Sequence, residues 1–154
     1  MSHIHEKIDF TSEVFIVCKN KVLLRMHDKY KIWLSVGGHI ELHEDPMQAA
    51  VREAKEEVGL NIQIFDTRLF KKELSDAIPL VAPQFLTRNR VSDKHEHVTF
   101  IYFATSQTDT LTNEGREHSE GLHWFTAKEL TDPKYNIRPD VQFYAQTALE
   151  KLGN

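Results

Sequence analysis

The sequence predicts an α/β fold of the α+β kind, in which a mixed sheet lies between helices. Short apolar strand patterns stand before and after one strongly marked helix at residues 46–58, and an amphipathic helical pattern at 139–152 closes the chain. The 154 residues, 40% hydrophobic and 27% charged, suit one compact domain spanning 1–154.

The segments before the central helix form a loose start followed by short strands. Residues 1–10 are polar and are expected to be a loose start or an edge strand. Three apolar runs joined by polar turns are expected to be strands: 13–19, 22–26 and 32–36. Cys18 is the only cysteine, which excludes an intramolecular disulfide, and we interpret it as a small buried hydrophobe. The third strand delivers the chain to a glycine turn at Gly37 and Gly38.

The central helix has clear start and stop signals. Asp45 suits the N-cap, Pro46 the first position, Gln48 the capping box, and Gly59 the stop. Four apolar residues recur at the spacing of one helical face and are expected to pack on a sheet: Met47, Val51, Ala54 and Val58. Ala49 and Ala50 are expected on an open surface beside the opposite, acidic face.

That acidic face carries Glu53, Glu56 and Glu57 near the C-terminal end of the helix. Carboxylates there interact unfavourably with the helix dipole and repel one another. Each effect destabilises the helix by about 0.3 to 1 kcal/mol. Clustered carboxylate oxygens are the ligands that a hard divalent cation requires. On the helix alone, a solvated acidic face with Arg52 screening Glu56 is the favoured interpretation, because runs of charged residues usually lie on the surface.

The spacing of the whole stretch favours a site. Gly38 is followed after five residues by Glu44 and after seven more by the run Arg52 to Leu60, REAKEEVGL. This pattern resembles the Nudix hydrolase signature at every fixed position. The segment 120–130, EGLHWFTAKEL, is similar to a common C-terminal pattern of the same family. The resemblance implies the Nudix fold, a mixed sheet between helices.

The resemblance also implies a reaction and a metal site. A divalent cation, Mg²⁺ with Mn²⁺ as the alternative, would be held by the Gly38 carbonyl and by Glu53, Glu56 and Glu57. Water would attack one phosphorus of a nucleoside diphosphate linked to another moiety. Arg52 would orient the carboxylates, with Glu44 reaching back to it or holding a second metal through water.

The general base differs among Nudix enzymes, so the resemblance leaves several candidates. Glu53 is the candidate inside the helix, and Glu120, in the loop before the last strand, is the first choice outside it. Three further residues outside the signature are open to the role: Glu96, Glu117 and His118.

The segments after the helix are expected to decide the substrate. Strands are predicted at three places: 61–72, 95–105 and 121–125. The stretch 73–94 is too long for an ordinary loop and forms either a lid or an extension of two strands. Arg88 and Arg90 are predicted to grip phosphate, and His95 and His97 share one strand face beside them.

Composition limits the partners. The net charge of −4 argues against a nucleic acid partner, and no apolar run is long enough to span a membrane, so we expect a cytoplasmic protein with a small nucleotide-type substrate. A homodimer is possible, as for many Nudix proteins. A nucleotide-sensing module without turnover is the alternative to an enzyme. A diphosphate isomerase needs a catalytic cysteine, for which Cys18 is poorly placed. The net negative charge also makes RNA decapping a less favoured function.

Overall fold

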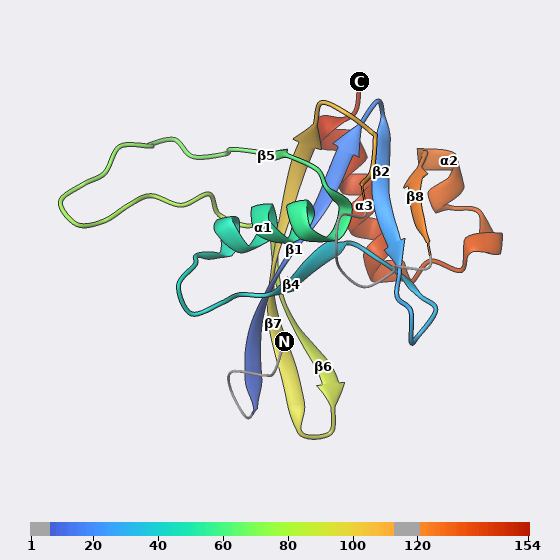
Figure 1. Ribbon diagram of the computed structural model, residues 1–154, viewed down its shortest axis with the longest axis horizontal. Helices are drawn as coiled ribbons and strands as arrows, with labels where there is room; N and C mark the ends of the chain where they lie inside the picture. The colour runs from blue at the N-terminus through green and yellow to red at the C-terminus, as the bar shows by residue number, and fades with distance from the viewer. Residues whose placement is uncertain (1–6, 113–120) are drawn as a thin grey trace.

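The computed structural model describes residues 7–112 and 121–154 (Figure 1). The secondary structure runs in this order: β1 (Ile8–Cys18), β2 (Lys21–Met26), β3 (Trp33–Leu34), β4 (Val36–His39), α1 (Pro46–Val58), β5 (Ile62–Ile64), β6 (Phe85–Ser92), β7 (His95–Ser106), β8 (Leu122–Phe125), α2 (Ala127–Leu130), a 3-10 turn (Pro133–Tyr135) and α3 (Pro139–Leu152). The predicted class, a mixed sheet with helices, is confirmed.

Strand β1 organises the sheet. Along its length it pairs in parallel with β7, while β4 and β2 pair antiparallel with successive parts of it. The path β3-β2-β1-β7-β5 forms the sheet, and β4, β6 and β8 attach to β1, β7 and β2. The pairing of β1 with β4 places the segment before α1 against the middle of the sheet.

The two faces of the sheet carry two separate cores. Alternate residues of β1 point in opposite directions, so Val14 and Ile16 join the core under α1, while Phe15 and Val17 join the core under α3. Helix α1 and helix α3 therefore pack on opposite faces, with the sheet between them (Figure 1).

Helix α1 spans the predicted residues and has the predicted caps. Asp45 accepts a hydrogen bond from the Gln48 N–H, the Gln48 side chain bonds back to the Asp45 N–H, and Gly59 ends the helix with a positive φ of 72°. The capping box and the left-handed glycine satisfy backbone groups that a helix end otherwise leaves unpaired.

The buried face of α1 is the predicted one in part: Ala54 and Val58 are fully buried and Met47 packs against the same core, as expected, but the rest of the face differs. Val51 is 41% exposed, whereas Ala49 and Ala50 are fully buried and Glu53 is only 9% exposed. The apolar stripe was assigned from side-chain polarity alone, but the sheet contacts a face rotated toward the glutamates. Two of the predicted surface positions are therefore core positions, and Glu53 is enclosed.

Strand boundaries differ from the prediction at several points. Strand β1 begins at Ile8, well before the expected start. Gly37 and Gly38 are not a turn but lie in β4, paired with Glu13 and Ser12 of β1. They have no positive φ, so glycine serves close packing there rather than a change of direction.

The connection after α1 is mostly irregular. Only Ile62–Ile64 of the predicted strand 61–72 is a strand, because Asp66 then closes a local loop by accepting hydrogen bonds from the Arg68 N–H and guanidinium. Within 73–94, Phe85–Ser92 forms β6 and pairs with β7, as the strand-extension alternative predicts.

The β6–β7 hairpin and the start of β1 reach beyond both α1 and α3 as an arm (Figure 1). In the part of the chain that the structure describes, no helix combines the length and hydrophobicity needed to cross a membrane.

Candidate active site

The acidic side of α1 faces the two glycines of β4. A side chain at Gly38 would meet Glu53 Oε1 at 2.4 Å, and one at Gly37 would meet the Ser12 carbonyl oxygen at 2.4 Å. The Gly37 N–H donates a hydrogen bond to Glu57 Oε2 at 3.2 Å. Only glycine allows the strand and the glutamates to approach this closely, so the two elements form one site.

Arg52 connects the carboxylates of the site. Its guanidinium binds Glu44 Oε1 at 2.7 Å, Glu53 Oε1 at 2.8 Å and Glu56 Oε2 at 3.1 Å. It also donates a hydrogen bond to the His39 carbonyl oxygen at 3.0 Å. The predicted contacts of Arg52 with the helix glutamates and with Glu44 are therefore present. The rigid, planar donor fork fixes three carboxylates relative to β4.

A second guanidinium, from Arg25 of β2, holds Glu57. Arg25 Nε lies 3.2 Å from Glu57 Oε2, and both side chains are largely enclosed. Behind them, the Ser35 hydroxyl donates a hydrogen bond to the Glu13 carboxylate at 2.9 Å. The sequence analysis missed Arg25 and Glu13. Both are charged residues within apolar strand patterns. A charged residue in such a pattern was the signal that could have identified them.

Burial dominates the electrostatics of the inner carboxyls. It raises the pKa of Glu57 to about 7, although Arg25 opposes the effect, and it raises the pKa of Glu53 against the opposing charge of Arg52. Burial also raises the pKa of Glu13. By contrast, the hydrogen bonds from Arg52 lower the pKa of Glu44. For the inner carboxyls, burial thus opposes ionisation more than the neighbouring guanidiniums favour it.

These residues fit a hard divalent cation. Four carboxyls, those of Glu44, Glu53, Glu56 and Glu57, pair with two guanidiniums, which leaves an excess of negative charge, and the Glu13 carboxyl adds to the negative charge that acts on Glu57. Carboxylate and carbonyl oxygens are the donors that Mg²⁺ and Mn²⁺ prefer. A divalent cation among them would favour the ionised carboxylates that burial disfavours.

The predicted substrate residues lie on both faces of the sheet arm. Arg88 and Arg90 are exposed on β6, and Arg88 forms an ion pair with Glu96. Asn89 lies between them and pairs with His97, so Asn89 and His97 share one face of the sheet. Arg88 and Arg90 therefore point to the opposite face, which is the face that α1 covers. His95 and His97 lie on the other side, beside Asp9. A substrate contact by any of the four stays a prediction.

The predicted base in the late loop lies outside the described residues. Glu120 falls in the segment 113–120, as do Glu117 and His118, so only Glu53 and Glu96 of the base candidates are placed. Glu53 lies within the site, whereas Glu96 is in β7 and pairs with Arg88.

Comparisons with known proteins agree with this geometry. A family model described as the NUDIX domain matches residues 10–146, which include the whole site. The chain belongs to the Nudix family. Nudix hydrolases in general split pyrophosphate linkages and need a divalent metal.

A solved structure supports this family assignment along the whole Nudix fold. A hydrolase of the Nudix family from Clostridium perfringens is 40% identical, with a TM-score of 0.86, covering 94% of this chain and 97% of that chain. The E. coli ORF135 protein, 19% identical with a TM-score of 0.62 over 96% of this chain and 91% of that chain, shows the same fold.

A curated relative is similar over a shorter stretch. The m7GpppN-mRNA hydrolase NUDT17 of Xenopus laevis is 30% identical over 93 residues, which are 57% of this Nudix chain. They are only 29% of that protein, so the match spans less than a third of the relative's length.

Proposed function

We propose that this Nudix hydrolase splits the diphosphate bond of a nucleoside diphosphate linked to another moiety, in a reaction that depends on Mg²⁺. The observation that carries the proposal is the packing of α1 on β4. It brings Glu53 and Glu57 against two glycines and leaves their carboxyls with raised pKa values. Enclosed oxygen donors with uncompensated charge are suited to a metal that binds a diphosphate.

The proposed ligands are Glu53, Glu56, Glu57 and the Gly38 carbonyl. When bound, Mg²⁺ supplies a more acidic water and neutralises charge on phosphate oxygens, and Mn²⁺ could replace it. Arg52 acts as a positioning residue, because its guanidinium already holds Glu53 and Glu56 in the folded chain. The Gly37 N–H and Arg25 do the same for Glu57.

Two residues are proposed as the base that takes a proton from the attacking water. Glu53 is held within the site, and burial raises the pKa of its carboxyl, which makes it a stronger proton acceptor when ionised. Glu120 is the candidate from outside the helix. The pH dependence of kcat in E53Q and E120Q distinguishes them, since loss of the base removes the acidic limb of the profile.

Substrate recognition is proposed to involve Arg88 and Arg90. Both are exposed cations on the same sheet face as α1, and a guanidinium binds phosphate through two parallel hydrogen bonds. Because a similar protein is an mRNA-cap hydrolase, a cap dinucleotide belongs among the candidate substrates. A homodimer and a cytoplasmic location stay predictions.

The test is release of phosphate, pyrophosphate or nucleotide from a panel of compounds with and without Mg²⁺. The panel contains nucleoside triphosphates, nucleotide sugars, dinucleoside polyphosphates and the cap dinucleotide m7GpppA. We expect Mg²⁺-dependent turnover of at least one member by the wild type and by E150Q, whose glutamate is exposed on α3. We expect a loss of about 100-fold or more in E56Q, because a metal ligand supplies several kcal/mol of transition-state stabilisation.

Two results would count against the proposal. Turnover that is equal in E56Q and wild type would place the chemistry elsewhere. Tight Mg²⁺-dependent binding of a nucleotide without any turnover would instead favour a sensing module.

A further inference from the structure

A second cluster of metal-ligating side chains surrounds Asp9 at the start of β1. Asp9 is 1% exposed, and its Oδ2 lies 3.1 Å from His95 Nε2 and 3.3 Å from His39 Nε2. The His97 ring packs edge-on against His95 and His39, with centroids 5.2 and 5.0 Å apart. The donor atoms of Asp9, His95 and His97 all lie within 4.8 Å of one another.

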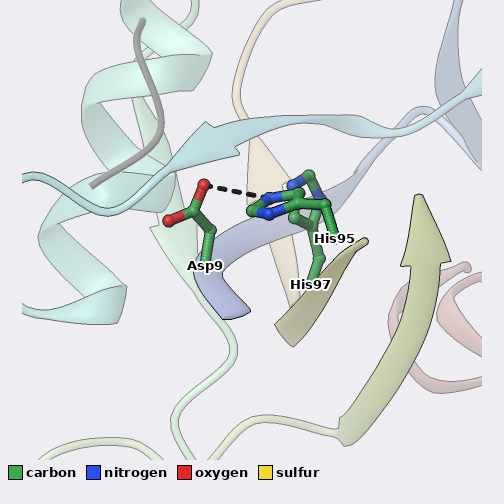
Figure 2. Close-up of side chains that lie close together, drawn as sticks. All are labelled: Asp9, His95 and His97. Carbon is green, nitrogen blue, oxygen red and sulfur yellow. Dashed lines mark ion pairs between the residues drawn. The ribbon is translucent and has the colours of Figure 1, made fainter. Parts of the chain in front are cut away.

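The sheet register brings these residues together. In the parallel pairing of β1 with β7, Asp9 is opposite His97, and His95 lies two residues earlier on the same face. His39, at the end of β4, is opposite Thr11, which follows Asp9 on that face. Figure 2 shows the Asp9 carboxylate and the two imidazoles of β7 turned toward one another. Three strands therefore deliver one carboxylate and three imidazoles to one place.

The chemistry of the cluster suits a transition metal. The Nε2 atoms of all three histidines are shielded from solvent, and the carboxylate is enclosed, so its negative charge requires a nearby positive partner. Protonation of one histidine supplies one charge, but protonating all three would place like charges side by side. A divalent ion supplies the charge while accepting lone pairs from neutral imidazoles.

We propose that Asp9, His95 and His97 form a binding site for a divalent transition metal of the zinc class, separate from the carboxylate site of α1. Imidazole and carboxylate donors suit Zn²⁺, Co²⁺ and Ni²⁺, whereas Mg²⁺ prefers oxygen donors alone. Around a tetrahedral Zn²⁺, bond lengths near 2.0 to 2.1 Å place ligand atoms roughly 3.3 Å apart. The 3.1 Å separation of Asp9 from His95 is close to this spacing, and the donor atom of His97 lies within 4.8 Å of both.

His39 lies beside the cluster but is not one of its three ligand residues. Its Nε2 lies 3.3 Å from Asp9 Oδ2. Asp9 and His39 also line a cavity of about 280 Å³ together with Pro46 and Phe100, which provides a route for the ion.

The bound ion would join the start of β1 to the start of β7, beside the β6–β7 turn and toward the free end of the arm that these strands form (Figure 1). Its ligand Asp9 also contacts His39, whose carbonyl oxygen accepts a hydrogen bond from Arg52 of the carboxylate site. The two metal sites thus adjoin neighbouring residues of β4, His39 and Gly38, yet they differ in donor chemistry. The ion is proposed to hold the arm and β4 in place, without taking part in hydrolysis.

The experiment is a titration of chelator-treated full-length protein with Zn²⁺, in competition with a chromophoric chelator and with excess Mg²⁺ present. His3 and His5 are replaced by Asn throughout, because that pair near the N-terminus is a rival metal-binding sequence. We expect one Zn²⁺ per chain, and an affinity about 100-fold or more lower in H95N and in H97N. E56Q should bind Zn²⁺ as its parent does.

The matched control is H123N. His123 Nε2 lies 3.1 Å from Glu129 Oε1, the same separation as between His95 and Asp9. His123 lies on β8 and belongs to no metal-ligating group among the residues that the structure describes. Its replacement should leave Zn²⁺ affinity unchanged. Binding that survives in both H95N and H97N, or that is lost in E56Q, overturns the proposal.

A measurement on the unaltered cluster guards against variants that fail to fold. X-ray absorption at the zinc edge counts imidazole ligands in the loaded His3→Asn, His5→Asn protein. At least two imidazoles support the site, and a shell of oxygens alone overturns it. Neither measurement uses hydrolysis, so the result is independent of the proposed activity.

Discussion

At the scale of single residues, the burial of Glu57 makes a prediction about pH. Its pKa is raised from 4.5 to about 7 in the folded protein, so the folded state binds a proton more tightly than the unfolded state does. The contribution of Glu57 to the free energy of unfolding is therefore fully present below pH 4.5 and is lost as the pH rises through about 7. With chelator present, the free energy of unfolding of the wild type should fall by on the order of 1 to 3 kcal/mol across this pH window, relative to that of E57Q.

Urea unfolding at pH 5 and pH 8 measures that difference. E150Q serves as the control, because Glu150 is exposed and its replacement should leave the pH dependence of wild type intact. A pH dependence of the free energy of unfolding that is identical in wild type and E57Q would show that Glu57 is not the buried acid.

Arg52 makes a second residue-scale prediction, which concerns positioning. Lysine keeps the charge of Arg52 but cannot bind Glu44, Glu53 and Glu56 with one planar fork. We expect kcat in R52K to fall about 10- to 100-fold, with a higher Mg²⁺ concentration needed for half-maximal rate and little change in KM. Kinetics at several Mg²⁺ concentrations test this, and a change confined to KM would instead indicate a substrate contact.

The residues of the site were predictable to different degrees. The signature predicted Gly38, Arg52 and the three glutamates, because these residues lie close together in sequence, in the helix and in the segment that leads into it. Arg25 and Glu13 come from strands distant in sequence, and only the tertiary packing shows that they meet Glu57. The cluster at Asp9 was invisible for the same reason, although His95 and His97 were noted as a pair.

At the scale of elements, β4 and α1 depend on each other through their close approach. At Gly37 an added Cβ meets backbone at 2.4 Å, whereas at Gly38 it meets the end of the Glu53 side chain, which can move. We expect G37A to lower the free energy of unfolding by about 1 to 3 kcal/mol. G38A should unfold more like the wild type but lose activity, because Glu53 is displaced.

Chemical denaturation and turnover of the three glycine variants measure these effects. The matched control is G121A, where an added Cβ would lie at an ordinary 3.5 Å from its nearest neighbour. Full activity in G38A would contradict the inference that Glu53 must lie against the strand.

Element boundaries followed from sequence where local signals were strong. Both the ends of α1 and its capping box were correctly predicted from Asp45, Gln48 and Gly59. Its buried face was predicted only in part: Ala54 and Val58 are buried as expected, but polarity alone placed Val51 inside and Ala50 outside, and it did not predict the burial of Glu53. The strand expected at 61–72 was wrong beyond Ile64, where the ion pair of Asp66 with Arg68 stabilises an irregular loop.

At the scale of the whole molecule, β1 contributes side chains to both cores. Loss of this strand exposes Val14 and Ile16 on one face and Phe15 and Val17 on the other. We therefore expect residues 1–154 to unfold as one cooperative unit, as the prediction of a single domain requires. Circular dichroism and tryptophan fluorescence should give coincident urea transitions with an m value of about 1 to 3 kcal/mol per molar. Two separated transitions would show independent units.

The central claim, that the acidic helix and the glycine strand bind a metal for attack of water on phosphorus, has a direct test. The best substrate from the panel is hydrolysed in water labelled with a heavy oxygen isotope, and the products are analysed by mass spectrometry. We predict one labelled oxygen in a phosphate-containing product of the wild type with Mg²⁺, and loss of labelled product without metal or in E57Q. Label in a product that lacks phosphorus, or equal labelling in E57Q, would contradict the account.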